Sequence, residues 1–403
     1  MDKARMDYDV YCGVDVGKST NYFVALKDIG EDRILSRSIL QDESEIRNVL
    51  AEVASHGKTL VTVDQYGCIG RLVVAVARDM GLDIAHISPR AFKRIAETYD
   101  ESKTDALDGY IIADVSRSTP RLISLIGNRQ EILEEIRVII SARDDIVKER
   151  TVYYNRLHDL INQVCPPLEA LFDKEKLHAD LPLRLFERYG GPCGFRRSGK
   201  LRVSRWAGGL KYHSTRGPQM VEEVFSALNS LTVLMPATMI IEEQIRRIAS
   251  RILGLEEEEK QLNHMLSERA VHIPEITILK SMPGIGKVYS ATIACEIADI
   301  GRFKNSSHLA SYGGVAPAKH ESGTSTKRDR KRKGGNRRLK NALIRSADLA
   351  RQHDPNCKAY YERKRAEGKT YKQALHALAR RRVEVIYALL STGSLYEPLP
   401  ETV

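Results

Sequence analysis

The sequence has no long apolar run. No stretch approaches the roughly 18 apolar residues that a membrane-spanning helix requires. The first eight residues are polar, unlike the apolar stretch of a signal peptide. These absences exclude a membrane protein and argue against secretion, and we therefore expect a cytoplasmic protein.

Cysteine is scarce as well. The chain has six cysteines, which lie far apart, and no two of them form a CxxC pair. This spacing argues against a zinc site and against a disulfide framework. Reduced thiols, each buried as a small apolar residue, are the simple interpretation.

Negative charge is in deficit, and the excess positive charge is unevenly spread. The 63 Lys and Arg residues outnumber the 53 Asp and Glu residues, which gives a net charge of +10. Ten basic residues oppose two acidic ones in 319–340, and nine oppose one in 184–216. Two internal runs of this kind predict a polyanionic partner, and nucleic acid is the first candidate.

A chain of 403 residues suits two or three domains, and residues 1–120 show the pattern of the first. Predicted strands fall at 9–16, 21–27, 33–40, 58–64 and 83–87, and predicted helices at 43–54, 69–80 and 104–117, with one more helix opened by Pro89. Three strands followed by alternating helices and strands is the order of a ribonuclease-H-like α/β domain.

Residues 121–272 have a different pattern, with apolar residues at steps of three and four in two long stretches. We expect two long helices that pack as a coiled coil, within or between chains, with Arg143, Arg150 and Glu259 as polar residues in the seam. Between them lies a basic insert near 170–217, rich in proline and glycine. Its arginines, Arg196, Arg197 and Arg205, are candidates for nucleic-acid contact.

Residues 273–403 are predicted to be mainly helical. The segment MPGIGK at 282–287 joins two predicted helices, and Gly284 and Gly286 would let backbone amides approach a phosphate, with Lys287 beside them. The segment resembles a helix-hairpin-helix turn, which grips a nucleic-acid backbone without reading its sequence. An ordinary turn between helices is the alternative, and the missing GK[ST] excludes a P-loop.

Four aspartates fall at the ends of predicted elements. Asp15 ends the first strand, Asp64 ends the fourth, and Asp105 and Asp108 lie three residues apart at a helix start, so they share a face. The first and fourth strands of a ribonuclease-H-like sheet are neighbours, so we expect the four carboxylates to meet. They would need a counter-charge such as Mg²⁺ or Mn²⁺, and a metal pair of this kind supports phosphoryl transfer. Taken singly, Asp15 could be a turn residue and Asp105 a helix-start residue.

A serine lies beside the first basic run. Ser322 is part of HESGTS at 320–325, and the basic residues that follow include Lys327, Arg328, Arg330, Arg332, Arg337 and Arg338. A serine hydroxyl attacks poorly until a base or metal activates it and the charge on its target is neutralised. A serine in a Gly/Ser/Thr loop is usually only part of the loop, so the local pattern assigns it no role.

Several motifs together resemble the DEDD transposases of the insertion sequence 110 family. They are the Asp15 strand, KTDALD at 103–108, SMPGIG at 281–286, YGGVAPAKHESGTS at 312–325 and GGNRRLKNAL at 334–343. The resemblance implies a bacterial recombinase with a RuvC-like domain that carries Asp15, Asp64, Asp105 and Asp108. It implies that Ser322 attacks DNA, and that a guide RNA made from the element pairs with donor and target DNA.

The sequence departs from this family in two places. Many members have Glu at the second acidic position, where this chain has Asp64, so a metal would have to lie closer to the strand. The basic insert around 196–205 also lengthens the middle region.

Three classes of function compete. The first is a recombinase that uses Ser322, as transposase or as site-specific invertase; the second is a metal-dependent junction nuclease that uses water. The third is a nucleic-acid-binding protein without catalysis, against which the four intact aspartates count. The apolar seams predict a dimer that assembles into a synaptic tetramer, at the bacterial nucleoid.

Overall fold

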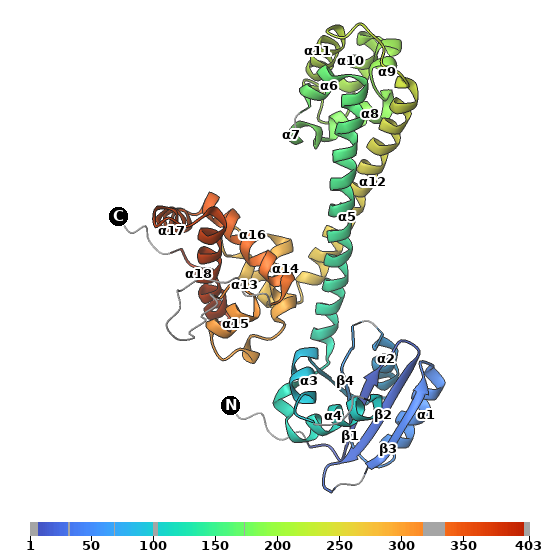
Figure 1. Cartoon of the computed structure of the whole chain (residues 1–403), viewed down its shortest axis with the longest axis vertical. Helices are drawn as coiled ribbons and strands as arrows, with labels where there is room; N and C mark the ends of the chain where they lie inside the picture. The colour runs from blue at the N-terminus through green and yellow to red at the C-terminus, as the bar shows by residue number, and fades with distance from the viewer. Residues whose placement is uncertain are drawn as a thin grey trace, which may run out of the picture. The chain divides into compact units, whose positions relative to one another are not determined.

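The computed structural model describes residues 7–30, 33–67, 69–99, 104–172, 174–316 and 335–398. The chain divides into two compact units, Met1–Glu134 and Glu135–Val403 (Figure 1). Each unit is treated by itself below. No helix in the described ranges is both long enough and apolar enough to span a membrane.

A mixed sheet forms the centre of the first unit. Its strands are β1 (Val10–Val16), β2 (Thr20–Lys27), β3 (Arg33–Leu40), β4 (Thr59–Val63), β5 (Asp83–Ile87) and β6 (Ile123–Leu125), in the order β3-β2-β1-β4-β5-β6. The first three strands pair antiparallel, β1 pairs parallel with β4, and β4 pairs parallel with β5. The predicted neighbourhood of the first and fourth strands is therefore confirmed.

Helices cover both faces of this sheet. They are α1 (Glu43–Ala54), α2 (Arg71–Asp79), α3 (Pro89–Ala96) and α4 (Asp105–Ser118), followed by a 3-10 turn at Pro120–Leu122. Side chains of alternate residues of β1 pack into two different hydrophobic cores, one on each face of the sheet. Cys12 packs with residues of α1 and α2, whereas Tyr11 packs with residues of α4. β1 is central because its strand is apolar on both faces.

The sequence missed β6. This strand has only three residues, of which Ser124 and Leu125 are exposed, and it pairs antiparallel with β5. A strand this short carries too little alternation to be recognised from sequence. It extends the sheet beyond residue 120, where the first domain was expected to end.

Two long helices, α5 (Asn128–Val164) and α12 (Thr238–Ala270), lie side by side in Figure 1. They run antiparallel, because Glu135 near the start of α5 contacts Arg269 near the end of α12, whereas Tyr154 contacts Glu256. The three polar residues predicted for the seam meet within one chain, since Arg143 and Arg150 both pair with the buried carboxylate of Glu259. Supercoiling of the two helices stays a prediction.

The basic insert is an ordered helical cap. Its helices are α6 (Pro166–Leu171), α7 (Lys174–Leu177), α8 (Asp180–Tyr189), α9 (Pro192–Ser198), α10 (Lys200–Gly208) and α11 (Arg216–Asn229). Phe172, Phe186 and Phe195 are buried in one core with residues of α5 and α12. The prolines and glycines mark helix boundaries, because Pro192 lies at the start of α9 and Gly190 ends α8 with a φ of 80°.

The last part of the chain is helical, as predicted. It contains α13 (Pro274–Lys280), α14 (Lys287–Ile297), a 3-10 turn at Ile300–Arg302, α15 (Ser306–Tyr312), α16 (Arg337–His353), α17 (Pro355–Ala366) and α18 (Tyr371–Thr392). Helix α16 contacts α14, α17 and α18. Its buried residues, among them Leu339, Leu343 and Ala347, recur every three or four positions along one face.

Candidate active site

Two strand ends bring Asp15 and Asp64 together. Parallel pairing aligns Val14 with Val63, so the next residue along each strand is an aspartate of the predicted set. The backbone N–H of Val16 donates a hydrogen bond to Asp64 Oδ1 at 3.2 Å. Register in the sheet, rather than a loop, therefore places these two carboxylates at one edge.

Helix α4 brings the other two aspartates toward the same edge. Its backbone packs very closely on β1, since a Cβ on Gly13 would lie 2.3 Å from the carbonyl oxygen of Gly109. A Cβ on Gly109 would in turn lie 3.2 Å from the carbonyl of the β2 residue that pairs with Asp15. Asp108 precedes Gly109 and is buried, with 6% of its surface exposed. The first turn of α4 therefore lies near the C-terminal end of β1.

The start of α4 is set by its cap. The Thr104 hydroxyl accepts a hydrogen bond from the Leu107 amide at 3.2 Å, which makes Asp105 the first residue of the helix. Asp105 is exposed, whereas Asp108, one turn later on the same side, is buried. We use the name acidic edge for the four residues Asp15, Asp64, Asp105 and Asp108.

Asp64 lies in an environment that disfavours its charge. Burial raises the pKa of Asp64 above its usual range, and the hydrogen bond from the Val16 amide opposes that shift only in part. The backbone oxygen of Asp64 accepts a hydrogen bond from His86 Nε2 at 3.2 Å, which fixes the strand end. A nearby cation would lower this pKa again and would favour the carboxylate.

The acidic edge supplies carboxylate oxygens, which hard cations prefer as ligands, but the described residues alone do not surround a cation with them. In the part of the chain that the structure describes, no three His, Cys, Asp or Glu side chains are grouped as a metal site. Mg²⁺ is commonly held by one or two carboxylates together with phosphate oxygens of the substrate. All-carboxylate donors and the raised pKa of Asp64 fit that mode of binding.

The turn after α13 has two glycines with different surroundings. Gly284 has a φ of 75°, and a Cβ on it would lie 2.4 Å from the backbone nitrogen of Ala350 in α16. Close packing on α16 therefore accounts for this glycine without a phosphate. Gly286 and Lys287 are exposed at the start of α14, and a Cβ on Gly286 would have no neighbour within 4 Å. Phosphate contact by this turn stays a prediction.

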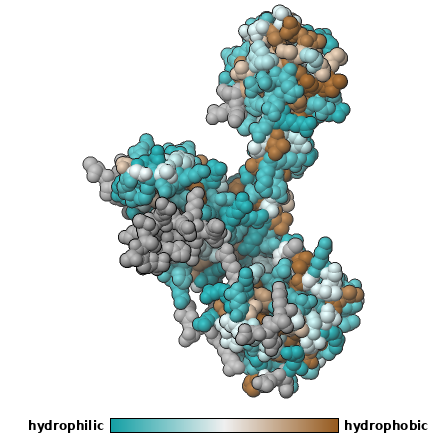
Figure 2. Space-filling view, in the orientation of Figure 1, coloured by the Kyte–Doolittle hydropathy of each residue, from teal (hydrophilic) through white to brown (hydrophobic). Residues whose placement is uncertain are grey.

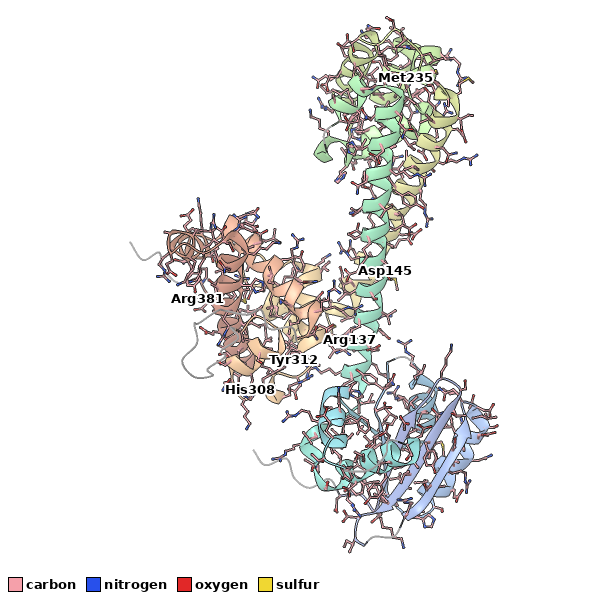
Figure 3. The ribbon with its side chains drawn as sticks, in the orientation of Figure 1. Arg137, Asp145, Met235, His308, Tyr312 and Arg381 are labelled. Atoms are coloured by element: carbon pink, nitrogen blue, oxygen red, sulfur yellow. The ribbon has the colours of Figure 1, made fainter. Side chains whose placement is uncertain are left out.

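Ser322 lies outside the described residues, as do Lys327, Arg328, Arg330 and Arg332. We call residues 315–333 the serine segment; the chain is described up to residue 316 and again from residue 335. The Asn336 amide donates to the backbone oxygen of Tyr312 at 2.7 Å. The Asn336 side chain donates to the Tyr312 hydroxyl at 3.1 Å and to Glu296 Oε2 at 2.5 Å. Gly314 and Gly335 are also in close contact. We call Glu296, Tyr312, Gly314, Gly335 and Asn336 the neck; Figure 3 labels Tyr312.

The remaining predicted basic residues differ in how they are used. Arg337 is exposed at the start of α16, and Arg338 donates to the Ser141 hydroxyl at 3.0 Å. In the cap, Arg196 donates to the backbone oxygens of Leu228 and Leu231 and so closes the end of α11. Arg197 and Arg205 are exposed, and Arg205 lines a shallow groove over the start of α10.

Sequence reasoning did not identify the neck. The available signal was the pair of double glycines, at 313–314 and 334–335, that flank the serine segment. Their role became clear only when the structure brought Gly335 against Gly314. The hydrogen bonds of Asn336 have no local sequence signature, because its partners lie 24 and 40 residues away.

Comparison with known proteins gives two family matches. Residues 12–166 match a family described as transposase, and residues 276–362 match one described as the transposase IS116/IS110/IS902 family. The chain is 34% identical to the insertion element IS110 43.6 kDa protein of Streptomyces coelicolor, over 97% of this chain and 96% of that protein.

Two further matches are partial. The chain is 32% identical to the pilin gene-inverting protein of Moraxella bovis, over 32% of this chain and 42% of that protein. Among solved structures, the RuvC protein of Thermus thermophilus matches at 12% identity and a TM-score of 0.24, covering 29% of this chain and 99% of that chain.

Proposed function

Since the chain belongs to the IS116/IS110/IS902 family of transposases, we propose that it cuts and rejoins DNA through a covalent serine–DNA intermediate. The observation that carries the proposal is the convergence of Asp64 and the first turn of α4 on the end of β1. Carboxylates at one sheet edge suit phosphoryl transfer, in which a cation neutralises the phosphate and positions the attacking oxygen.

Ser322 is the proposed nucleophile. Its hydroxyl loses a proton and forms a bond to phosphorus, while one P–O bond of the DNA backbone breaks and the released oxygen takes up a proton. The serine phosphodiester conserves the bond, so a second DNA end can reverse the step without an external energy source. The neck holds the two ends of the serine segment together, which supports a defined role for that segment.

A divalent cation, Mg²⁺ or Mn²⁺, is the proposed cofactor. Asp15, Asp64, Asp105 and Asp108 would hold it, and when bound it would offset the negative charge of the phosphate under attack. Asp108 is buried and Asp105 exposed, so within this set we expect Asp105 to hold the cation from the side that faces the substrate. The alternative, a junction nuclease, would use the same carboxylates with water.

We divide the chain into a RuvC-like catalytic domain, predicted at 1–120 and extended by β6 to residue 125, a helical arm that runs from there to 272, and a serine domain at 273–403. The RuvC-like assignment is supported by the strand order β3-β2-β1-β4-β5 and the strand directions. Within the arm, the pairing of Arg143 and Arg150 with Glu259 supports a fixed register of α5 and α12.

The proposed partners are donor and target DNA, a guide RNA and further copies of the chain, as a dimer that assembles into a synaptic tetramer. Net charge supports a nucleic-acid partner, since Lys and Arg exceed Asp and Glu by ten. Lys287, Arg197, Arg205 and Arg337 are exposed and remain proposed contacts. Sequencing of the RNA that copurifies with the full chain tests the guide. Enrichment of one RNA made from the element supports it, and copurified RNA in which no sequence is enriched would contradict it.

A site-specific invertase is the second candidate, and the similarity to the pilin gene-inverting protein favours it. Its chemistry is the same, so the two functions separate only by substrate. The experiment uses the full chain, Mg²⁺ and plasmids that carry the element ends either in inverted orientation or on separate molecules. Insertion between molecules supports a transposase, inversion within one molecule supports an invertase, and cleavage without joining would contradict both.

A further inference from the structure

Three cations surround one tyrosine ring at the junction of α17 and α18. Arg363, Lys364 and Arg381 lie 5.1, 5.5 and 5.3 Å from the centre of the Tyr360 ring. We call these four residues the Tyr360 cluster; Figure 3 labels Arg381. Each contact is favourable by itself, because a cation is attracted to the face of an aromatic ring. Three like charges around one ring, however, repel one another.

Among the residues that the structure describes, only one of these three cations, Lys364, forms an ion pair with a carboxylate. Lys364 pairs with Glu367 at 2.7 Å, and the two lysines around Glu367 lower its pKa to about 2. Among the ion pairs of the described ranges, none joins Arg363 or Arg381 to an acidic residue. Both arginines are exposed, so their guanidinium groups are accessible to a partner in solution.

A second aromatic cluster, formed by residues of α16, α17 and α18, is balanced in charge and offers a direct contrast. Arg351 lies 5.1 Å from the ring centre of Tyr361 and 5.5 Å from that of Tyr371. Asp348 pairs with Arg351 at 2.7 Å and accepts a hydrogen bond from the Tyr371 hydroxyl at 2.9 Å. One carboxylate thus balances one guanidinium there, whereas Arg363 and Arg381 of the Tyr360 cluster have no ion pair with an acid in the described part of the chain.

The surrounding sequence adds to the imbalance. Residues 358–382 contain nine Lys or Arg and only two acidic residues, Glu362 and Glu367. Glu362 follows Tyr360 by two positions on α17, which places it on the other side of the helix. The visible surface at α17 is mainly hydrophilic in Figure 2. This basic stretch lies C-terminal to the two runs that the charge pattern emphasised.

We propose that the Tyr360 cluster binds the phosphodiester backbone of a nucleic acid, with Arg363 and Arg381 as the two phosphate ligands. Guanidinium groups suit phosphate because their parallel N–H donors match its oxygens. The ring holds the guanidiniums in place and so lowers the entropy lost on binding. The inference rests on the proposed function, since it assigns a contact for the same substrate away from the reacting atoms.

The test compares the salt dependence of binding for the full chain and for the double variant Arg363→Gln, Arg381→Gln. The probes are a mixed-sequence DNA duplex and a single-stranded RNA of the same sequence, titrated between about 50 and 200 mM salt. Two lost phosphate contacts should lower the slope of log affinity against log salt by about 1.8 for the duplex or about 1.4 for the single strand. The probe that shows the change identifies the nucleic acid.

Two controls separate phosphate contact from other effects of lost charge. Arg247→Gln with Lys260→Gln removes two exposed cations of α12, each paired with a carboxylate, and should leave the slope unchanged. Arg363→Lys with Arg381→Lys keeps both charges and should keep most of the slope. A double glutamine variant that melts like wild type and retains the wild-type slope on both probes overturns this inference alone. A wild-type chain that binds neither probe overturns the proposed function with it.

Discussion

The acidic edge and the serine segment are positioned by different means. Strand pairing sets Asp15 and Asp64, because each follows directly from the register of β1 with β4. The serine segment is instead tied at its two ends by the neck, through Tyr312 and Asn336. One half of the proposed chemistry therefore depends on the core of a sheet, and the other on a few specific hydrogen bonds. Substitutions in the acidic edge and in the neck should therefore impair the protein in different ways.

The largest effect is expected at the serine. Ser322→Ala should lower strand exchange by roughly a thousandfold or more, since removal of a nucleophile removes the covalent route. Thr324→Ala and Ser325→Ala serve as controls and should keep near wild-type rates. Exchange of labelled DNA ends measures all three variants. A Ser322→Ala protein that still exchanges strands would move the chemistry to a neighbour or to water.

The next effect is expected at the acidic edge. Asp108→Asn should reduce strand exchange by at least about a hundredfold. Removing a residue that only hydrogen-bonds to a metal ligand already lowers metal affinity or activity by about 10–100-fold, and Asp108 is proposed to be a ligand itself. DNA binding should change little, since the variant keeps the shape of the side chain. Asp114→Asn is a matched control on α4, where Asp114 pairs with Arg117. Equal activity of the two variants would remove Asp108 from the proposed site.

A smaller effect is expected at the neck. Asn336 and Asn305 both cap helices. Their side-chain oxygens accept hydrogen bonds from the backbone amides of Leu339 and His308, each at 3.0 Å. Replacement of either by alanine should cost about 1 kcal/mol in the free energy of unfolding. Only Asn336→Ala should also lower strand exchange, by about tenfold to a hundredfold, because it releases the serine segment. If Asn336→Ala and Asn305→Ala have equal stability and equal activity, Asn336 acts only as a helix cap and the neck has no role in strand exchange.

The smallest effect concerns the pH dependence of stability. The raised pKa of Asp64 means that the folded chain favours the protonated carboxyl, so stability should be lost as the pH rises through that pKa. Asp64→Asn removes this loss of stability, and the asparagine oxygen can still accept the hydrogen bond from the Val16 amide. In chelator, the variant should melt higher than wild type at about pH 7, by no more than about 4 °C, and the difference should vanish near pH 4. A constant difference across this range would contradict the assignment.

The same contrast explains what could be predicted from sequence. The run KTLVTVD at 58–64 specifies both a buried strand and the aspartate at its end, so β4 and Asp64 followed from one pattern. Local signals failed where distant partners decide the outcome. The close packing of Gly284 on Ala350 could not be read from its own motif, and its approach to phosphate stays a prediction. The insert near 170–217 was recognised as basic, but its phenylalanine core needed the structure.

The central claim is that the serine segment and the acidic edge act in one covalent reaction. The direct measurement is mass analysis of peptides released from the full chain after denaturation during DNA cleavage. The account predicts a nucleotide linked to the peptide that contains Ser322, formed by wild type with Mg²⁺ and absent in chelator or in the Asp108→Asn variant. Cleaved DNA with free ends and no linked peptide would contradict the account and favour the junction nuclease.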